Sequence, residues 1–233
     1  MLEILYQDEH IVAINKPHGL LVHQSPIARD AEEFALQLLR DQLGQNVWPA
    51  HRLDRKTGGV LLFSLDQETN KLLQAKFRDN EMDKEYLALV RGFFPDELTI
   101  DYPLRKENGV LQEALTHLQL LSKTEVDFQI GTHSTSRYSL VLAKPQTGRM
   151  HQIRKHLAHV MHPIIADRPH GCNKQNRYFK QELEMDTMLL HAHSLAFKHP
   201  YTEENIFITA SLQSEFLRMI THLNLSFPSY SSK

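Results

Sequence analysis

Short apolar runs separated by turn residues dominate the first part of the chain. Residues 2–6 and 11–15 have the pattern of two strands around an acidic turn, and residues 20–23 resume it after a Lys-Pro-His-Gly break. Residues 60–63 form a continuous apolar run after a glycine pair, which is typical of a strand buried on both faces. The pattern therefore predicts a series of short strands in this region.

Apolar residues also recur at the helical period in several places. Residues 31–43 follow this period, and Gly44 stands where it would end the helix. Asp66 can cap a second helix, whose inward face would hold Leu72, Leu73 and Phe77. A third helix is predicted to be capped by Thr147 and to end before Pro163, with His151, Ile153, Leu157 and Val160 along it. A fourth, amphipathic helix is predicted over residues 212–223.

The remaining apolar segments predict further strands. They cover residues 86–90, 114–121, 137–143, 189–197 and 206–210, while residues 92–113 are expected to form a crossover and residues 167–177 a polar loop. Because strands and helices do not alternate strictly, we expect an α+β protein with a large mixed, mostly antiparallel sheet and flanking helices. The sequence has no internal repeat and no low-complexity linker, so residues 1–233 are expected to form one domain.

The composition is that of an ordinary globular protein. Of the 233 residues, 41% are hydrophobic and 23% are charged, and no apolar run approaches the ~20 residues that a membrane-spanning helix needs. The first residues are acidic, so we expect no signal peptide. The single cysteine, Cys172, excludes an internal disulfide and a cysteine-rich zinc site. We therefore expect a cytoplasmic protein with no membrane partner.

Basic residues are concentrated in one segment, although the net charge is -2. Residues 137–180 hold nine Lys and Arg but only one acid, Asp167, whereas the rest of the chain holds 17 basic and 27 acidic residues. Such a stripe is typical of phosphate binding, although an accidental bias on a solvated surface would give the same counts. The charge distribution favours an anionic partner such as a nucleic acid.

The first segment that could carry chemistry is His51-Arg52-Leu53-Asp54-Arg55-Lys56-Thr57-Gly58-Gly59. Asp54 lies between Arg52 and Arg55, and neighbouring cations keep a carboxylate ionised and available as a nucleophile or a base. A loop ion-pair network that only ties strand ends together would use the same residues. The glycines allow either a close approach of the backbone to a substrate or a tight turn.

Two later segments add an aromatic ring and a basic helix start. Tyr86 lies in a predicted strand, where a tyrosine is either part of the core or a flat face on which a base can stack. Residues 147–156 place Arg149, His151, Arg154 and Lys155 at a predicted helix start, where free backbone N–H groups bind anions. Arg154 can pair bidentately with a carboxylate such as Asp54. A solvated basic helix face is the alternative interpretation.

Histidine is abundant, with 15 residues in the chain. His156, His159 and His162 recur every three residues, and His191 and His193 follow later, which raises the alternative of a metal site. The chain has no His-Glu-x-x-His motif, and the histidine-rich helix holds no acid that would complete a ligand set. Structural or phosphate-adjacent histidines fit the pattern better, so no metal is expected.

Taken together, the three segments resemble the pseudouridine synthases of the large-subunit-rRNA synthase A type. That family has His-Arg-Leu-Asp-Arg, then Lys-x-Tyr-x-Ala, then Thr-Gly-Arg-x-His-Gln-Ile/Leu-Arg-x-His, in this order and at comparable spacing. The resemblance covers nearly the whole chain. The opening Leu-Glu-Ile-Leu-Tyr-Gln-Asp-Glu, Asn15-Lys16-Pro17 and His162-Pro163-Ile164-Ile165 resemble the branch that acts on a uridine at tRNA position sixty-five.

The chain departs from the family pattern at two places. It has Thr57-Gly58-Gly59 where the family usually has Thr-Ser-Gly, and Ala166-Asp167 where the family usually has Gly-Asp. Both are exchanges between small residues. Several relatives carry an RNA-binding domain of the S4 type before the catalytic domain, and none is expected before Met1.

The resemblance implies a pseudouridine synthase fold in one catalytic domain, with two lobes around a cleft. It implies that a tRNA uridine is isomerised by N1–C1′ cleavage, rotation of the base and C5–C1′ bond formation, without a cofactor. Asp54 would be the essential carboxylate, as a nucleophile or as a base, and Arg154 would orient it. Tyr86 would stack on the uracil and could relay the C5 proton.

Substrate binding is assigned to a wider set of residues. A uridine in a stem must be flipped out, and Arg52 would fill the vacated space. The other predicted substrate-binding residues are Arg55, Arg149, His151, Lys174 and Arg177. We expect a monomer whose partner is tRNA, with no protein partner. Two alternatives remain at this point: a metal-dependent hydrolase that uses the histidines and Asp54, and an RNA-binding module without catalysis.

Overall fold

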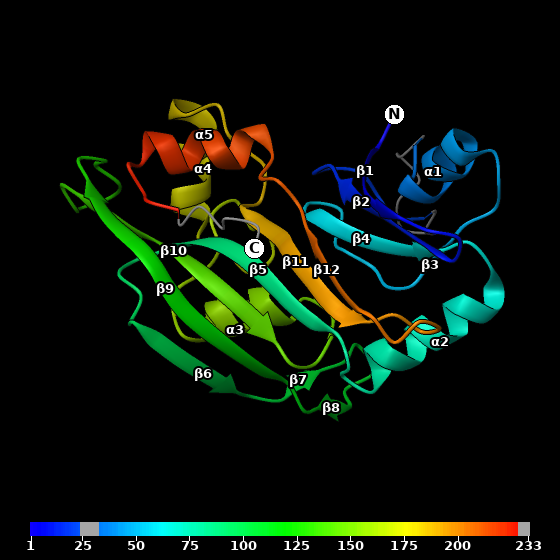
Figure 1. Cartoon of the computed structure of the whole chain (residues 1–233). Coiled ribbons are helices and arrows are strands. Elements are labelled where there is room, and N and C mark those ends of the chain that lie inside the picture. The colour runs from blue at the N-terminus through cyan, green and yellow to red at the C-terminus, as the bar shows by residue number, and fades with distance from the viewer. Residues whose placement is uncertain (24–32, 228–233) are drawn as a thin grey trace. The chain divides into compact units, whose positions relative to one another are not determined.

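The computed structural model describes residues 1–23 and 33–227, and the chain divides into two compact units (Figure 1). Unit 1 comprises Met1–Glu85 and His191–Gln213, and unit 2 comprises Tyr86–Leu190 and the chain from Ser214 onward. Two strands, β5 (Asp83–Arg91) and β11 (Leu190–Lys198), carry the chain from one unit to the other. None of the helices in the described ranges has the length and apolar character needed to span a bilayer.

Unit 1 is built on a sheet whose strands run in the order β1-β2-β4-β11-β12. The strands are β1 (Glu3–Gln7), β2 (Ile11–Lys16), β4 (Gly58–Ser64), β11 and β12 (Asn205–Thr209), and the short β3 (Trp48–Pro49) also pairs with β4. The β4–β11 pair is parallel and the other pairs in this unit are antiparallel. The unit also holds helices α1 (Ala35–Leu43) and α2 (Gln67–Arg78).

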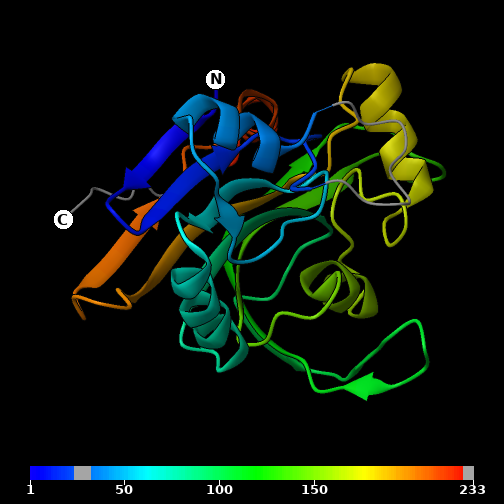
Figure 2. The same ribbon diagram turned by 90° about the vertical axis from the view of Figure 1, so that its right-hand side faces the viewer.

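The core of unit 1 explains why β2 and β4 are apolar at most positions. All residues of both strands are buried, so each strand packs on both of its faces. Val60 and Leu62 share a core cluster with Leu73 of α2 and the apolar side chains of β11 and β12, and Figure 2 shows α2 beside β3. The predictions for residues 60–63 and for a helix capped by Asp66, whose carboxylate accepts from Thr69 N at 2.8 Å, are confirmed. Leu72, predicted on the inward face of that helix, is exposed instead.

Unit 2 has an antiparallel sheet in the order β5-β10-β9-β6. Its strands are β5, β10 (Ser136–Pro145), β9 (Leu115–Val126) and β6 (Glu97–Asp101), and a separate hairpin pairs β7 (Leu104–Arg105) with β8 (Leu111–Gln112). The helices are α3 (Gln152–His159), α4 (Asn173–Glu182) and α5 (Ser214–His222). Ile153 and Leu157 of α3 share a core cluster with Val141 and Ala143 of β10.

The predicted α+β class with a mixed, mostly antiparallel sheet is confirmed, with several local corrections. Residues 92–113 hold β6, β7 and β8 as well as connecting loops, and residues 20–23 form only an isolated bridge between Leu21 and Phe34. The helix predicted from residue 31 begins at Ala35, with its first two predicted residues outside the described range, and ends at Gly44 in the left-handed conformation (φ 66°). The arrangement of two lobes around a cleft stays a prediction.

Two predictions near the basic segment are wrong. Thr147 does not cap α3, because the helix begins five residues later at Gln152 and the Thr147 hydroxyl donates to the Gln152 side chain instead. Residues 167–177 are not a continuous polar loop, because α4 begins at Asn173. Helix α4 has little apolar character, and burial of Gln175 and Phe179 anchors it.

Candidate active site

The loop that carries Asp54 is fastened by a buried ammonium group. Lys16, at the end of β2, is fully buried, and its Nζ donates to the carbonyls of Arg55 (3.2 Å), Leu20 (2.8 Å) and Pro17 (3.0 Å). Within the loop, Thr57 N donates to the Asp54 carbonyl at 3.0 Å. Lys16 therefore ties the Asp54 loop to the turn that follows β2.

Lys16 is also electrostatically coupled to Asp54. Burial lowers the pKa of Lys16 to about 7, and the negative charge of Asp54 opposes this shift by favouring the ammonium form. The two residues lie 38 positions apart in sequence, and the pairing of β2 with β4 brings them together. Lys16 was not among the predicted site residues, although the Asn15-Lys16-Pro17 motif was the signal that could have found it.

The residues flanking Asp54 have different surroundings. His51 accepts a hydrogen bond from Leu62 N at 3.1 Å and stacks on Phe77. Burial, and secondarily the nearby Lys84, lower its pKa to about 3, so it is a neutral structural anchor. Arg55 is exposed, and its Nε donates to the Gly19 carbonyl at 3.0 Å. Arg52 is exposed, and its role in filling the space of a flipped base stays a prediction.

The glycine pair after Asp54 is required by close packing. A Cβ at Gly58 would overlap the ring of His18 and the side-chain amide of Gln213. Gly59 has a positive φ of 105°, and a Cβ there would overlap the backbone of Ala192 on the neighbouring strand. These contacts show that Gly58 and Gly59 are needed for packing within the protein itself, a role that differs from both interpretations of the sequence. The close approach of this backbone to a substrate stays a prediction.

Tyr86 stands at the first position of unit 2, on β5. Its register partner is Ala143 of β10, and its half-buried ring packs against the core cluster that contains Ile153 and Leu157 of α3. One part of the aromatic ring is therefore supported by the core. The prediction that its other part stacks on a base is untested.

The start of α3 is organised by the buried side chain of Gln152. Its Oε1 accepts from the Thr147 hydroxyl (2.6 Å) and from Arg149 N (3.0 Å), and its Nε2 donates to the Leu115 carbonyl (3.0 Å). Arg149 lies in the loop before the helix, and its Nε donates to the Glu113 carbonyl at 3.0 Å. Gln152 thus holds the Thr-Gly-Arg segment against the start of β9.

Arg154 forms a buried, bidentate ion pair. Its Nε and Nη2 each lie 2.8 Å from a carboxylate oxygen of Asp167, and both side chains are almost completely buried. The Asp167 carboxylate also accepts from His170 N at 3.3 Å, and its backbone carbonyl accepts from the Asn176 side chain of α4 at 2.7 Å. A planar guanidinium held in this way has a fixed orientation, so Asp167 positions Arg154. Pairing between Arg154 and Asp54 stays a prediction.

His151 immediately precedes α3 in the left-handed conformation, with φ 56°. Its Nδ1 lies 3.0 Å from Nε2 of His170, so one of these nitrogens donates to the other. The predicted phosphate-binding residues Lys174 and Arg177 are both exposed on α4, three positions apart, and therefore lie on one face of that helix. The structure thus gathers Arg149, His151 and Arg154 around the start of α3, and places Lys174 and Arg177 on a separate helix of the same unit.

Comparison with known proteins identifies the family. A family model described as RNA pseudouridylate synthase matches residues 10–159, which include all three motif segments. The chain belongs to the RNA pseudouridylate synthase family. This synthase is therefore an isomerase, and the alternatives of a metal-dependent hydrolase and of an RNA-binding module without catalysis do not hold.

Close relatives of this synthase match almost their full length. The protein named tRNA pseudouridine synthase C from Vibrio parahaemolyticus is 43% identical, over 94% of this chain and 94% of that protein. The protein of the same name from Haemophilus ducreyi is 41% identical, over 98% of this chain and 98% of that protein. The one from Yersinia pestis is 44% identical, over 90% of this chain and 86% of that protein.

Solved structures confirm the predicted pseudouridine synthase fold. Human RNA Pseudouridylate Synthase Domain Containing 4 superposes with a TM-score of 0.74 at 24% sequence identity, over 97% of this chain and 95% of that chain. Human RNA Pseudouridylate Synthase Domain Containing 1 gives a TM-score of 0.71 at 21% identity, over 97% and 96%.

The histidines of this synthase are distributed among several structural roles. In the described parts of the chain, no group of three or more His, Cys, Asp and Glu has the arrangement of a metal site. His156 is buried, with Nδ1 2.9 Å from the Thr116 hydroxyl and Nε2 3.0 Å from the Tyr102 carbonyl, and burial lowers its pKa. His162 contacts the Arg91 carbonyl through Nδ1 at 2.9 Å. These two histidines connect the end of α3 and the following turn to neighbouring segments.

Proposed function

We propose that this protein converts a uridine of tRNA to pseudouridine, at the position sixty-five that the sequence resemblance implies. The N1–C1′ bond breaks, the uracil turns, and C5 bonds to C1′. The proton leaves C5 and N1 ends with a proton, so substrate and product are isomers. No oxidant, reductant or group donor enters this balance, so no cofactor is required. The observation that carries the proposal is the match of relatives named tRNA pseudouridine synthase C over at least nine-tenths of the chain.

Asp54 is the proposed essential carboxylate. Its loop is fixed through the Lys16 ammonium, which donates to the Arg55 carbonyl at 3.2 Å. A nearby cation favours the ionised form of a carboxylate, which is the form needed for attack on the sugar or base, or for removal of the C2′ proton. The proposal leaves both routes open, because either one starts from an ionised Asp54.

Arg154 and Tyr86 are the other proposed catalytic residues. The guanidinium of Arg154 is held by Asp167 at 2.8 Å, so it can present its remaining edge without losing its orientation. In our proposal that edge orients Asp54. Tyr86 stacks on the flipped uracil, and its phenol relays the proton that leaves C5. Arg154 is buried and Tyr86 is half-buried, which limits their motion during the reaction.

RNA binding is proposed to use the basic residues around these groups. Flipping a paired uridine costs a few kcal/mol of unstacking and unpairing. Arg52 is proposed to occupy the vacated space, while Arg55, Arg149, His151, Lys174 and Arg177 contact the RNA. We propose that the protein acts in the cytoplasm as a monomer, and that the whole chain serves as one catalytic domain.

The test is to map pseudouridine in tRNA from cells that have or lack this protein, and then with purified enzyme. Asp54→Asn keeps the shape of the side chain but removes its charge, so we expect single-turnover pseudouridine formation to fall by about a thousandfold or more. Asp41→Asn, in which an exposed carboxylate of α1 is neutralised, is the matched control and should keep full activity. tRNA binding should match the wild type in both variants. Thermal unfolding should match it in Asp41→Asn, while Asp54→Asn should stay folded but unfold at a slightly lower temperature, because Lys16 loses the negative charge that favours its ammonium form.

Pseudouridine above background with Asp54→Asn would remove Asp54 from the catalytic assignment. An unchanged pseudouridine map in cells that lack the protein would contradict the tRNA assignment. Loss of pseudouridine at another tRNA position would correct the position alone.

A further inference from the structure

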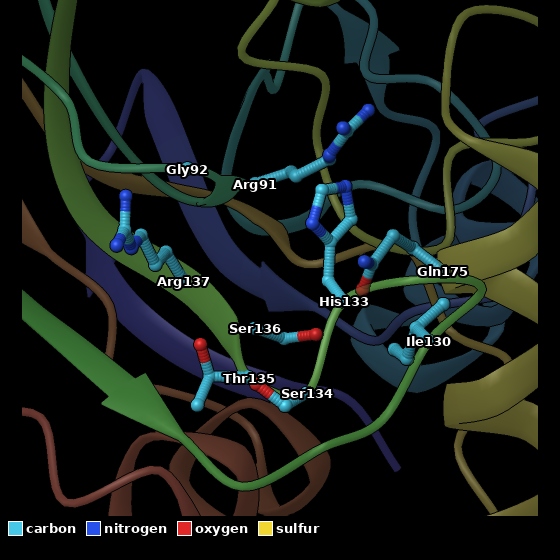
Figure 3. A pocket seen from close by; sticks show the side chains of 9 residues that line it. All are labelled: Arg91, Gly92, Ile130, His133, Ser134, Thr135, Ser136, Arg137 and Gln175. Carbon is cyan, nitrogen blue, oxygen red and sulfur yellow. The ribbon is translucent and has the colours of Figure 1, made fainter.

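A polar cavity lies in unit 2, between the end of β5, the start of α4 and the loop that joins β9 to β10 (Figure 3). It has a volume of about 320 Å³. Neither Asp nor Glu is among its lining residues, and Ile130 is its only lining residue with an aliphatic side chain. A cavity lined in this way offers hydrogen bonds and positive charge, in contrast to the apolar walls typical of small-molecule pockets.

The loop that forms one wall is held in place by side-chain hydrogen bonds. Ser136 Oγ donates to the Phe128 carbonyl at 2.9 Å, and Thr135 Oγ1 donates to Glu125 at 2.6 Å. Ile130 and His133 form an isolated antiparallel bridge across the loop. His133 is exposed, and Figure 3 shows its ring in the cavity close to the Gln175 amide. The wall therefore has a defined shape that presents an imidazole.

Gln175 is a buried polar side chain with a fixed orientation. Its Oε1 accepts from the hydroxyl of the fully buried Tyr138 at 2.6 Å. This bond assigns the oxygen to Tyr138, so the Nε2 donors remain for the cavity that Gln175 lines. An amide that is buried and oriented without a ligand is the kind of preformed donor that binds an anion with little loss of side-chain entropy.

Arg91 brings the positive charge to the cavity. No salt bridge to Arg91 occurs in the described parts of the chain, and its Nη1 makes only a long contact, 3.9 Å, with Cys172 Sγ. Arg137 differs, because its Nε lies 3.3 Å from Glu125 and its guanidinium covers the ring of Phe93 at 4.9 Å. In Figure 3 the Arg137 side chain extends away from His133. Arg91 is therefore the guanidinium that remains available at this site.

The start of α4 adds a second source of positive potential. Cys172 is the N-cap residue and its side chain makes no capping hydrogen bond, while Gln175 belongs to the first turn. The N–H groups of a first turn have no partner within the helix and attract negative charge. The Lys174 ammonium lies close to Gly131 of the facing loop and strengthens this potential.

We propose that this cavity binds a phosphate group of the RNA backbone. The proposal rests on the proposed action on tRNA and adds a contact site to it. A phosphodiester has two free oxygens and one negative charge, and Arg91, His133 and the Gln175 amide can each donate to it. Binding at this site would position the RNA without reading its sequence.

The experiment compares Arg91→Ala with Arg40→Ala, in which an exposed arginine paired with Asp41 is removed from α1. Dissociation constants for an unmodified tRNA transcript are measured over a series of salt concentrations. With Arg91→Ala we expect binding to weaken roughly three- to tenfold, and the slope of log K against log salt to become shallower by about 0.7–0.9. His133→Ala should weaken binding in the same direction, Arg91→Lys should retain the slope, and Arg40→Ala should match the wild type.

Equal affinity and slope in Arg91→Ala, His133→Ala and Arg40→Ala would overturn the proposal. Inorganic phosphate that stabilises the wild type but not Arg91→Ala, while the tRNA affinity of that variant stays normal, would assign the cavity to a small anion and overturn the RNA assignment. Pseudouridine yield is measured in parallel. Arg91-dependent tRNA binding without pseudouridine formation would support this site and contradict only the proposed reaction.

Discussion

Lys16 illustrates how one buried side chain organises the loop of a catalytic residue. Its ammonium binds three backbone carbonyls from two separate turns, and Asp54 lies within electrostatic range. A buried charge costs free energy unless it is paired and hydrogen bonded. Here the cost is offset by the carbonyls that it satisfies and by the carboxylate that favours the charged form.

We expect Lys16→Met to destabilise the protein by about 2–4 kcal/mol. Three carbonyls lose their donor, and this loss outweighs the gain from removing a buried charge. Urea unfolding monitored by circular dichroism measures this change in the free energy of unfolding. Lys71→Met, at an exposed position of α2, is the control and should change stability little. Equal stability of the two variants would show that the carbonyls find other donors.

Gly58 and His18 form a packing pair that explains one departure from the family pattern. The serine that the family usually has at this position would overlap the His18 ring and the Gln213 amide. We expect Gly58→Ser to lower the free energy of unfolding by about 1–3 kcal/mol, as overpacked cores do. Adding His18→Ala removes the overlap with the ring but leaves the overlap with Gln213, so it should recover part of this loss, which a double-mutant cycle measures. Additive effects of the two substitutions would contradict this packing explanation.

The second departure from the family pattern, Ala166 in place of the usual glycine, concerns the backbone conformation at this position. Ala166 has a positive φ of 61°, the conformation that glycine adopts without cost and that the usual family residue would suit. The strained residue is held by Asn176 of α4, whose Oδ1 accepts from Ala166 N at 2.8 Å. The exchange is therefore tolerated because a helix side chain fixes the turn, and Asp167 keeps its position beside Arg154.

At the scale of elements, α4 changes the account of the basic segment. Gln175 and Phe179 are its buried residues, four positions apart, so this side of the helix faces the core. Lys174 and Arg177 are exposed and reach the solvent from a rigid helix, which differs from the predicted polar loop. Rigid positions lose less side-chain and backbone entropy when they bind a phosphate.

We expect the double variant Lys174→Ala and Arg177→Ala to bind tRNA with a shallower salt slope, by about 0.7–0.9 for each phosphate that the variant no longer neutralises. The helix should persist because alanine is the best helix former. Binding titrations over a range of salt concentrations measure the slope, and the single-turnover rate at saturating tRNA should stay near normal. Lys71→Ala with Arg78→Ala on α2 is the matched control, and an unchanged slope in the α4 variant would remove these residues from the RNA-binding surface.

At the scale of the whole molecule, buried neutral histidines make stability depend on pH. Burial lowers the pKa of His18 to about 4 and those of His51 and His191 to about 3. Lys16 adds to the shift of His18 and Lys84 to that of His51, whereas a hydrogen bond to the Ala210 carbonyl opposes the shift of His191. In the unfolded chain these groups titrate near the ordinary value of about 6.5. The unfolded state therefore binds more protons below pH 6.5, so the stabilisation is present above that pH and is lost on acidification.

We expect the free energy of unfolding to fall by roughly 2–5 kcal/mol between pH 7 and pH 5. Urea unfolding at a series of pH values measures this loss. His51→Gln removes one of the titrating groups and should flatten the dependence over this range, while Gln74→Asn, at an exposed position of α2 that does not titrate, should leave it unchanged. A stability that is constant from pH 7 to pH 5 would contradict the assignment of these histidines as neutral in the folded protein.

Local sequence patterns by themselves determined the position of many helices and strands, and they identified the motifs that carry the chemistry-bearing residues. The apolar run at residues 60–63, the Asp66 cap and the terminating Gly44 are short-range signals, and each produced the expected structure. The motif segments around Asp54, Tyr86 and Arg154 pointed to the synthase family, because chemistry-bearing residues recur there in a fixed order. Their individual roles in the reaction stay predictions.

Only the tertiary structure decided which distant residues support these motifs. Lys16 beneath the Asp54 loop, Asp167 on Arg154 and Gln152 on the Thr147 turn are contacts fixed by strand pairing and helix packing. Helix α4 was missed because its sequence is mostly polar, and its stability comes from burying Phe179 and Gln175 against the rest of unit 2. The physical reason is general: local patterns record backbone preference, whereas burial and hydrogen-bond pairing depend on residues that folding brings together from far along the chain.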